Sequence, residues 1–168
     1  MDALFERLSD EIDSTLMGMK ADDWLRAPSG KWNVAQIVEH LSRAFGGTAK
    51  MLEVALTNNQ HPQVGVPTLK HRMGRLLVIG VGYFPSGATA PAQVQPKGLE
   101  GEEALRRVRE NIVRMDAALS EAEKRWGSGL LANHPVLGPL SACEWRKFHV
   151  LHGLHHLRQV RQRRKLNP

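Results

Sequence analysis

Histidine is the residue type with the clearest chemical potential in this sequence. Eight histidines occur in 168 residues, and four of them fall between residues 149 and 156. On a helix, which turns by about 100° per residue, His152 and His156 lie about 40° apart on one face, and His149 lies within about 60° of that pair. Two neutral imidazoles one turn apart can bind a common divalent ion at about 2.0–2.1 Å. A solvent-facing or hydrogen-bonded pair is the alternative interpretation.

A third histidine, His40, lies on the apolar stripe of another predicted helix, together with Ile37 and Leu41. A lone histidine on such a face is usually a core residue with a hydrogen-bond partner. If this helix faces the one that carries His152 and His156, three imidazoles from two helices form a site with an open position. Three protein ligands plus water are typical of catalytic zinc sites. Imidazole suits both zinc and nickel, so the residue types do not choose between them.

Three neighbouring residues are candidates for a supporting role. Gln159 lies nearly in line with the histidine pair and is expected either to orient a nearby group or substrate, or to bond to the backbone. Arg158 could pair with a carboxylate of a substrate or thiol cofactor. His149 could line the pocket. Glu39 is expected to be a surface charge, because adjacent helix positions diverge by about 100° and His40 already faces inward.

Apolar residues that recur every three or four positions predict the helices that must position these side chains. Asn33 with Gln36, and Ser141 with Glu144, form capping-box patterns that mark two of the helix starts. The predicted helices cover residues 2–20, 34–58, 68–81, 101–126 and 142–164.

The connections between these helices complete the predicted fold. Residues 82–99 contain Pro85, Pro91 and Pro96 and are expected to form an extended connection, whereas residues 127–140 are expected to form a loop. No segment alternates between apolar and polar residues over a strand length. The fold class is therefore all-α: a single-domain four-helix bundle with an additional short helix. The long connection between the second and third long helices permits a crossover.

The composition excludes several classes of protein. With 42% hydrophobic and 24% charged residues, the chain is an ordinary globular domain rather than a disordered or fibrous protein. A single cysteine, Cys143, excludes an internal disulfide and a cysteine-rich zinc site. The sequence shows neither a secretory signal nor a bilayer-spanning apolar segment, so we expect a cytoplasmic protein.

The formal net charge of +6 is concentrated at the end of the chain. Seven cations and no acid follow Glu144, whereas the remainder holds 16 cations and 17 acids. A basic last helix end, residues 158–168, is expected to be solvated and to complement the helix dipole. The alternative is a tail that contacts nucleic acid or acidic lipid. We expect no nucleic-acid partner and no membrane contact.

Three segments resemble the DinB-like (YfiT-like) metalloenzyme superfamily. Gly30 to Leu41, GKWNVAQIVEHL, resembles its W-S/N-x-x-E/Q-I-x-x-H-L segment. His152 to Val160, HGLHHLRQV, resembles its C-terminal H-x-x-x-H-x-x-Q-I helix. His134 to Ser141, HPVLGPLS, followed by Glu144-Trp145, is similar to the P-x-x-G-x-L-T-x-x-E-W lead-in of a DUF1569-type branch.

The resemblance implies a DinB-type four-helix bundle, often a homodimer, in which His40, His152 and His156 hold a divalent metal, zinc or nickel. Characterised relatives include transferases and isomerases that depend on low-molecular-weight thiols. The resemblance thus implies an enzyme for a small-molecule substrate, with S-transferase-like or hydrolase-like chemistry carried by metal-bound water or thiolate. A non-catalytic metal- or small-ligand-binding bundle is the alternative.

Overall fold

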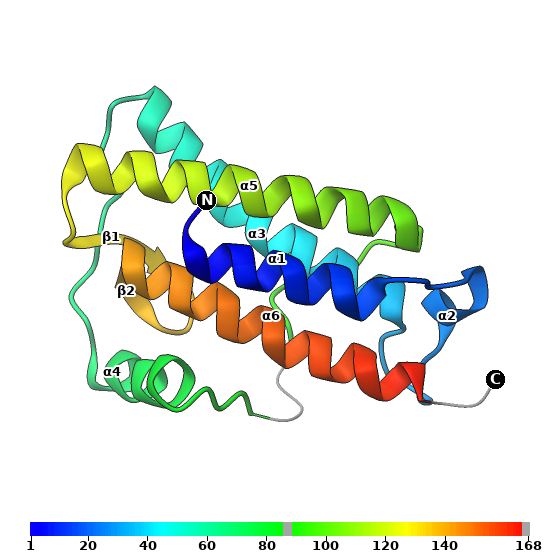
Figure 1. Ribbon diagram of the computed structural model, residues 1–168. Coiled ribbons are helices and arrows are strands. Elements are labelled where there is room, and N and C mark those ends of the chain that lie inside the picture. The colour runs from blue at the N-terminus through cyan, green and yellow to red at the C-terminus, as the bar shows by residue number, and fades with distance from the viewer. Residues whose placement is uncertain (86–88, 166–168) are drawn as a thin grey trace.

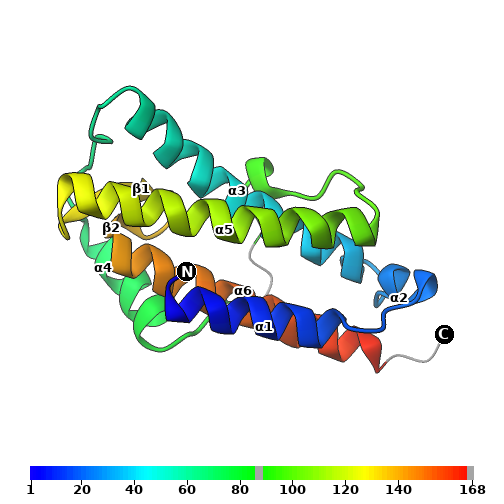
Figure 2. The ribbon, with the colours of Figure 1, turned by 45° about the horizontal axis from the view of Figure 1, so that its top comes forward.

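The computed structural model describes residues 1–85 and 89–165, and four long helices form most of it. Helix α3 packs along α5, while α1 packs mainly along α6 (Figures 1 and 2). The hydrophobic core lies between these helices. The long helices are α1 (Ala3–Leu16), α3 (Val34–Thr57), α5 (Gly101–Trp126) and α6 (Ala142–Arg164).

The chain crosses over between the second and third long helices, as the length of the connection allowed. Residues 58–100 return from the end of α3 to the start of α5, so that these two helices run in the same direction (Figure 1). Helices α1 and α6 also run parallel to each other (Figure 1). The crossover contains α4 (Leu69–Arg75), the π-helical turn η1 (Leu76–Gly80) and the 3-10 turn η2 (Ala92–Val94). Residues 86–88 of the predicted connection lie outside the described residues.

Both predicted capping boxes are confirmed. Asn33 Oδ1 accepts a hydrogen bond from the Gln36 N–H at 2.8 Å, and Gln36 Oε1 accepts one from the Asn33 N–H at 2.9 Å. Ser141 and Glu144 exchange the same pair of bonds, at 3.3 and 2.9 Å. Each box satisfies backbone donors that a helix start leaves without a partner. The two helices that carry the histidines therefore begin where the sequence indicates.

The first predicted helix, residues 2–20, is too long. Helix α1 ends at Leu16, and Gly18 follows in the left-handed region, at φ 71°. A new helix, α2 (Ala21–Leu25), then begins. Its first turn is held by the Asp23 carboxylate, which accepts a hydrogen bond from the Lys20 N–H at 2.9 Å.

A β-hairpin replaces the loop predicted for residues 127–140. Strands β1 (Leu130–His134) and β2 (Gly138–Ser141) pair antiparallel, with His134 opposite Gly138. A turn of three residues, 135–137, joins the strands, and such a turn is followed by a residue in the left-handed conformation. Gly138 is this residue, with φ 71°. Leu131, Leu137 and Leu140 are buried, so the hairpin covers the end of the helical core.

No helix in the described part of the chain is long and apolar enough to cross a bilayer.

Candidate metal centre

Three histidines from two helices meet inside the molecule, as the sequence pattern predicts. His40 projects from the second turn of α3, and His152 and His156 project from successive turns of α6. His40 Nε2 lies 3.2 Å from His152 Nε2, and His156 Nε2 lies 3.1 Å from the same atom. The three ligand atoms all lie within 4.8 Å of one another. His40 and His156 are buried, and His152 is partly exposed.

The outer hydrogen bonds of His40 and His156 determine which ring nitrogen carries the proton. His40 Nδ1 lies 2.8 Å from the carbonyl oxygen of Val94, which can only accept, so Nδ1 is the donor. His156 Nδ1 lies 3.0 Å from Gln159 Oε1 and is a donor for the same reason. In the neutral rings, both Nε2 atoms therefore present lone pairs to His152 Nε2.

These lone pairs leave the histidine cluster unsatisfied on its own. His152 can donate at most one Nε2 proton, so one of the two facing lone pairs would still lack a donor. When His152 carries its proton on Nε2, its buried Nδ1 holds a lone pair without a partner. When His152 carries its proton on Nδ1 instead, that N–H is a donor without an acceptor. Such orphaned buried groups are costly. A cation that accepts all three Nε2 lone pairs removes the conflict at the centre of the cluster.

The spacing of the nitrogens suits that cation. Ligands about 2.0–2.1 Å from a tetrahedral zinc ion lie about 3.3 Å from each other. The two Nε2–Nε2 separations, 3.2 and 3.1 Å, are close to this value. The residues present therefore fit a divalent metal with three imidazole ligands and an open position.

Burial keeps the cluster in its ligand-competent, neutral form. Desolvation lowers the pKa of His40, and it lowers the pKa of His156 to about 3 with help from the nearby His40. Desolvation also holds the pKa of His152 well below its usual range, with His156 and His40 adding to the effect. A metal binds the neutral form of the histidine ring.

Glu39 is buried, and the prediction that it is a surface charge is wrong. Its side chain is 1% exposed and accepts three backbone hydrogen bonds, from the N–H groups of Lys97 (2.7 Å), Gly98 (2.9 Å) and Leu99 (2.9 Å). The crossover covers the flank of α3 on which Glu39 lies, which helical periodicity alone does not reveal. Glu39 thereby anchors the segment whose Val94 carbonyl orients His40.

Gln159 connects two histidines on α6. Its Oε1 accepts from His156 Nδ1, and its Nε2 lies 3.1 Å from His155 Nε2. The ring of Phe84 lies against both His155 and His152, with centroid distances of 4.9 and 5.9 Å. The crossover thus contacts the cluster at Phe84 as well as at Val94.

The remaining candidate residues, His149 and Arg158, are not part of the cluster, and neither is the hairpin histidine His134. The Nε2 atom of His149 lies 3.0 Å from Thr48 Oγ1, and its ring stacks on Trp145. His134 Nδ1 accepts from the N–H groups of Val136 and Leu137 in the hairpin turn, both at 3.1 Å. Arg158 is exposed on the surface of α6.

The basic end of α6 is largely bonded within the molecule. Arg161 pairs with Glu11, and Arg164 donates to the carbonyl oxygen of Thr15. Arg163 is buried and donates to the carbonyl oxygen of Trp32 at 2.6 Å. These cations join α6 to α1 and to the start of α3. Residues 166–168 of the predicted basic end lie outside the described part of the chain.

A mostly helical fold with three converging histidines defines a class of helical proteins with a candidate metal site. Residues 4–160 match the family model of the DinB superfamily, so the chain belongs to that superfamily. Searches for similar curated proteins and similar solved structures gave no significant match.

Proposed function

We propose that this protein is a divalent-metal-dependent enzyme whose metal ligands are His40, His152 and His156. The observation that carries the proposal is the convergence of three Nε2 atoms, two of them with lone pairs fixed by outer hydrogen bonds. Zinc or nickel bound there would act as a Lewis acid and would lower the pKa of a water or thiol ligand. Membership of the DinB superfamily supports a DinB-type bundle around this site.

The surrounding residues favour thiol-dependent S-transfer over base-assisted hydrolysis. Glu39, the acid next to His40 in the sequence, has both carboxylate oxygens engaged by backbone N–H groups. It is therefore poorly placed to accept a proton from substrate. A thiol needs no strong base once its pKa is lowered, because the thiolate is itself the nucleophile. We therefore propose a low-molecular-weight thiol as co-substrate, with hydrolysis as the second chemistry.

The proposed substrate is a small electrophile. Phe84 and the His155–Gln159 pair contact the cluster and supply an apolar wall and polar groups beside it. The exposed guanidinium of Arg158 is one residue from Gln159 and suits a carboxylate of the thiol or the substrate. The hairpin segment that resembles the DUF1569-type lead-in supports placing the protein in that branch.

A non-catalytic metal-binding role has less support. A structural zinc site normally has four protein ligands. The nearest further histidine rings, His149 and His155, are engaged by Thr48 and Gln159. Within the described residues, the cluster that could hold a metal contains three side chains, which leaves one position for an exogenous ligand.

Metal content tests the proposal directly. Protein purified without a histidine tag or chelator should contain close to one equivalent of zinc or nickel by mass spectrometry. His152→Ala should lose this metal. His61→Ala should keep it, because His61 is an exposed histidine outside the cluster. Thiol-dependent transferase activity should follow the metal content. Absence of metal from the parent protein, even after reconstitution with zinc and nickel, would contradict the proposal.

A further inference from the structure

The outer surface of α4 and η1 is apolar and exposed. The described part of the chain has 15 exposed large hydrophobic side chains, and eight of them lie between residues 64 and 83. Single exposed apolar residues need no explanation, but a contiguous group marks an interaction surface. Leu69 is 75% exposed and Met73 58% exposed, and neither α4 nor η1 contains a buried residue.

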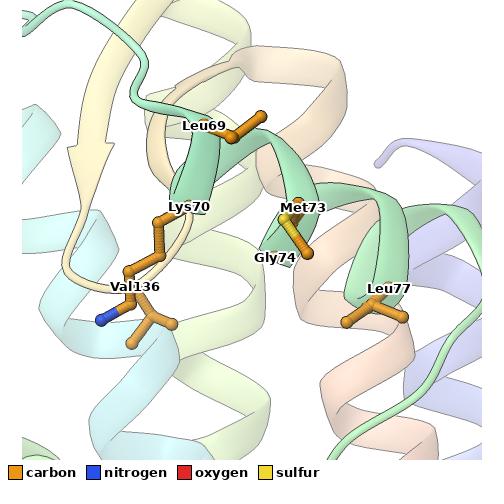
Figure 3. A pocket seen from close by; sticks show the side chains of 6 residues that line it. All are labelled: Leu69, Lys70, Met73, Gly74, Leu77 and Val136. Atoms are coloured by element: carbon orange, nitrogen blue, oxygen red, sulfur yellow. The ribbon is translucent and has the colours of Figure 1, made fainter.

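Side chains on this surface line a shallow groove. Its volume is about 420 Å³, and its lining consists of Leu69, Lys70, Met73, Gly74, Leu77 and Val136. Figure 3 shows Leu69, Met73 and Leu77 projecting from one side of the helical segment, with Lys70 and Val136 beside them. Val81 and Tyr83, which follow the helical segment in the sequence, are also exposed.

The charges around this surface are positive. No Asp or Glu occurs between Glu53 and Glu100, whereas Lys70 and Arg72 are exposed on α4 itself. Helix α6 packs against η1 and carries no acid after Glu144, which pairs with Arg75 at 3.1 Å. An apolar surface with cations and no unpaired acid complements a partner that is both apolar and anionic.

We propose that the α4–η1 surface docks onto an anionic phospholipid bilayer. An interfacial helix inserts its apolar side chains at the boundary between headgroups and acyl chains, while its cations bind the anionic headgroups. Leu69, Met73 and Leu77 would enter this boundary, and Lys70 and Arg72 would reach the headgroups. This surface would rest on the membrane without spanning it.

Two other occupants fit these observations less well. Phosphates of a nucleic acid would match the cations but would leave Leu69 and Met73 exposed to water. A symmetric contact with a second copy would cover the apolar side chains but would bring Lys70 and Arg72 towards their own counterparts. The sequence offers the basic chain end as an alternative contact for acidic lipid. The cations there are largely bonded within the molecule, so we place the lipid contact at α4.

Vesicle flotation tests the proposal on the full chain. Vesicles of equal parts phosphatidylglycerol and phosphatidylcholine should bind the protein at about 0.1 M salt and release most of it at about 1 M, where the Debye length falls to about 3 Å. Vesicles of phosphatidylcholine alone should bind weakly. The Lys70→Glu/Arg72→Glu variant should lose binding at least tenfold, since each cation contributes about a fivefold effect. The Leu69→Ser/Met73→Ser variant should lose it by a similar factor.

The control is Val113→Ser, which changes a side chain of matching exposure, 59%, on α5. It should bind vesicles like the parent, and all variants should keep the parent's circular dichroism and metal content, because the substituted side chains are exposed. Equal vesicle binding by the parent and the α4 variants would overturn the proposal. A parent that binds no anionic vesicle would also overturn it. So would a parent that binds an oligonucleotide in preference to vesicles and loses that binding in the Lys70→Glu/Arg72→Glu variant, or a dimer that the Leu69→Ser/Met73→Ser variant dissociates.

Discussion

Glu39 accepts a hydrogen bond from the backbone N–H of Leu99 at 2.9 Å, which joins α3 to a residue 60 positions further along the chain. The next residue of α3, His40, bonds to the carbonyl of Val94, five residues before Leu99. Arg43, one helical turn later, donates to the carbonyl of Gln93 at 2.9 Å. Three side chains of one helix therefore fix the backbone of residues 93–99, and one of the three is a proposed metal ligand.

The substitution Glu39→Gln should weaken metal binding without touching a ligand. An amide presents a single oxygen acceptor, so at least one N–H of residues 97–99 loses its partner, and the Val94 carbonyl loses its fixed position. Loss of a direct outer hydrogen-bond partner of a metal ligand typically lowers affinity by about 10- to 100-fold, and Glu39 acts one step further out, so the lower end of this range, about 10-fold, applies. We expect a decrease of that size by competition with a chelator, together with faster amide exchange at Lys97, Gly98 and Leu99.

The control for this effect is Glu53→Gln. Glu53 forms an exposed ion pair with Arg114 at 2.7 Å, and such pairs contribute about 0–1 kcal/mol. Its metal affinity should equal that of the parent. If Glu39→Gln lowers the free energy of unfolding but leaves the metal dissociation constant unchanged, Glu39 holds the crossover without affecting the site.

Gln159 should matter for the orientation of His156. In Gln159→Leu, the His156 Nδ1 proton loses its acceptor. The tautomer and ring orientation that direct the Nε2 lone pair inwards are then no longer fixed. Metal affinity should fall by about 10- to 100-fold. Gln162→Leu changes an exposed residue of the same type on the same helix and should have no effect. Equal affinities of the two variants would rule out this role for Gln159.

Acid should destabilise the metal-free protein below about pH 6.5. Burial lowers the pKa of His149 to about 3 and that of His134 to about 4, both from an ordinary value of 6.5. The unfolded chain therefore binds more protons between these values, and the free energy of unfolding decreases as the pH falls from 6.5 towards 3. Each such histidine contributes a slope of up to about 1.4 kcal/mol per pH unit.

Urea unfolding of the chelator-treated protein between pH 7 and pH 4 measures this slope. His149→Gln removes one titrating group and keeps a polar side chain near Thr48, so its stability should depend less steeply on pH. His61→Gln, at an exposed position, should retain the slope of the parent. Parallel curves for the parent and His149→Gln would show that His149 does not take up a proton on unfolding.

Gly153 lets α1 and α6 approach each other between two of the proposed ligands. A Cβ atom at this position would lie 2.6 Å from Leu8 Cδ1, and Leu8 is fully buried. Gly153→Ala should therefore cost about 1–3 kcal/mol of stability. At Gly47 on α3, a Cβ atom would meet nothing within 4 Å, so Gly47→Ala should stabilise the helix by about 0.5–1 kcal/mol. Opposite shifts in thermal midpoint would verify both expectations.

Helix starts and the histidine cluster were accessible from the sequence because both depend on local spacing. The capping residues Asn33 and Ser141 lie three positions before Gln36 and Glu144, and His152 and His156 are one turn apart. The hairpin was missed because β1 and β2 are too short to show alternation. The sequence does contain its turn signal, a glycine at residue 138 after a proline-containing loop.

Long-range packing explains the remaining differences. The side of α3 that carries Glu39 is covered by residues 97–99, and no periodicity within α3 encodes that contact. The same holds for His149, whose hydrogen-bonding partner, Thr48, is 101 positions away. Such pairs depend on how the crossover and the helices pack, which is a property of the whole chain.

The bond between His40 and Val94 has a consequence for how this region can vary in evolution. Because the acceptor is a main-chain carbonyl, no side-chain replacement at residue 94 removes it. The three amides held by Glu39 are likewise main-chain groups. Most side-chain replacements in residues 93–99 therefore leave these bonds in place. The exceptions are proline at residues 97–99, which would remove an N–H donor, and a replacement of Gly98, whose φ is 95°. A single insertion or deletion, by contrast, would shift the carbonyl away from His40. Homologous sequences should differ in this segment by substitution and not by length.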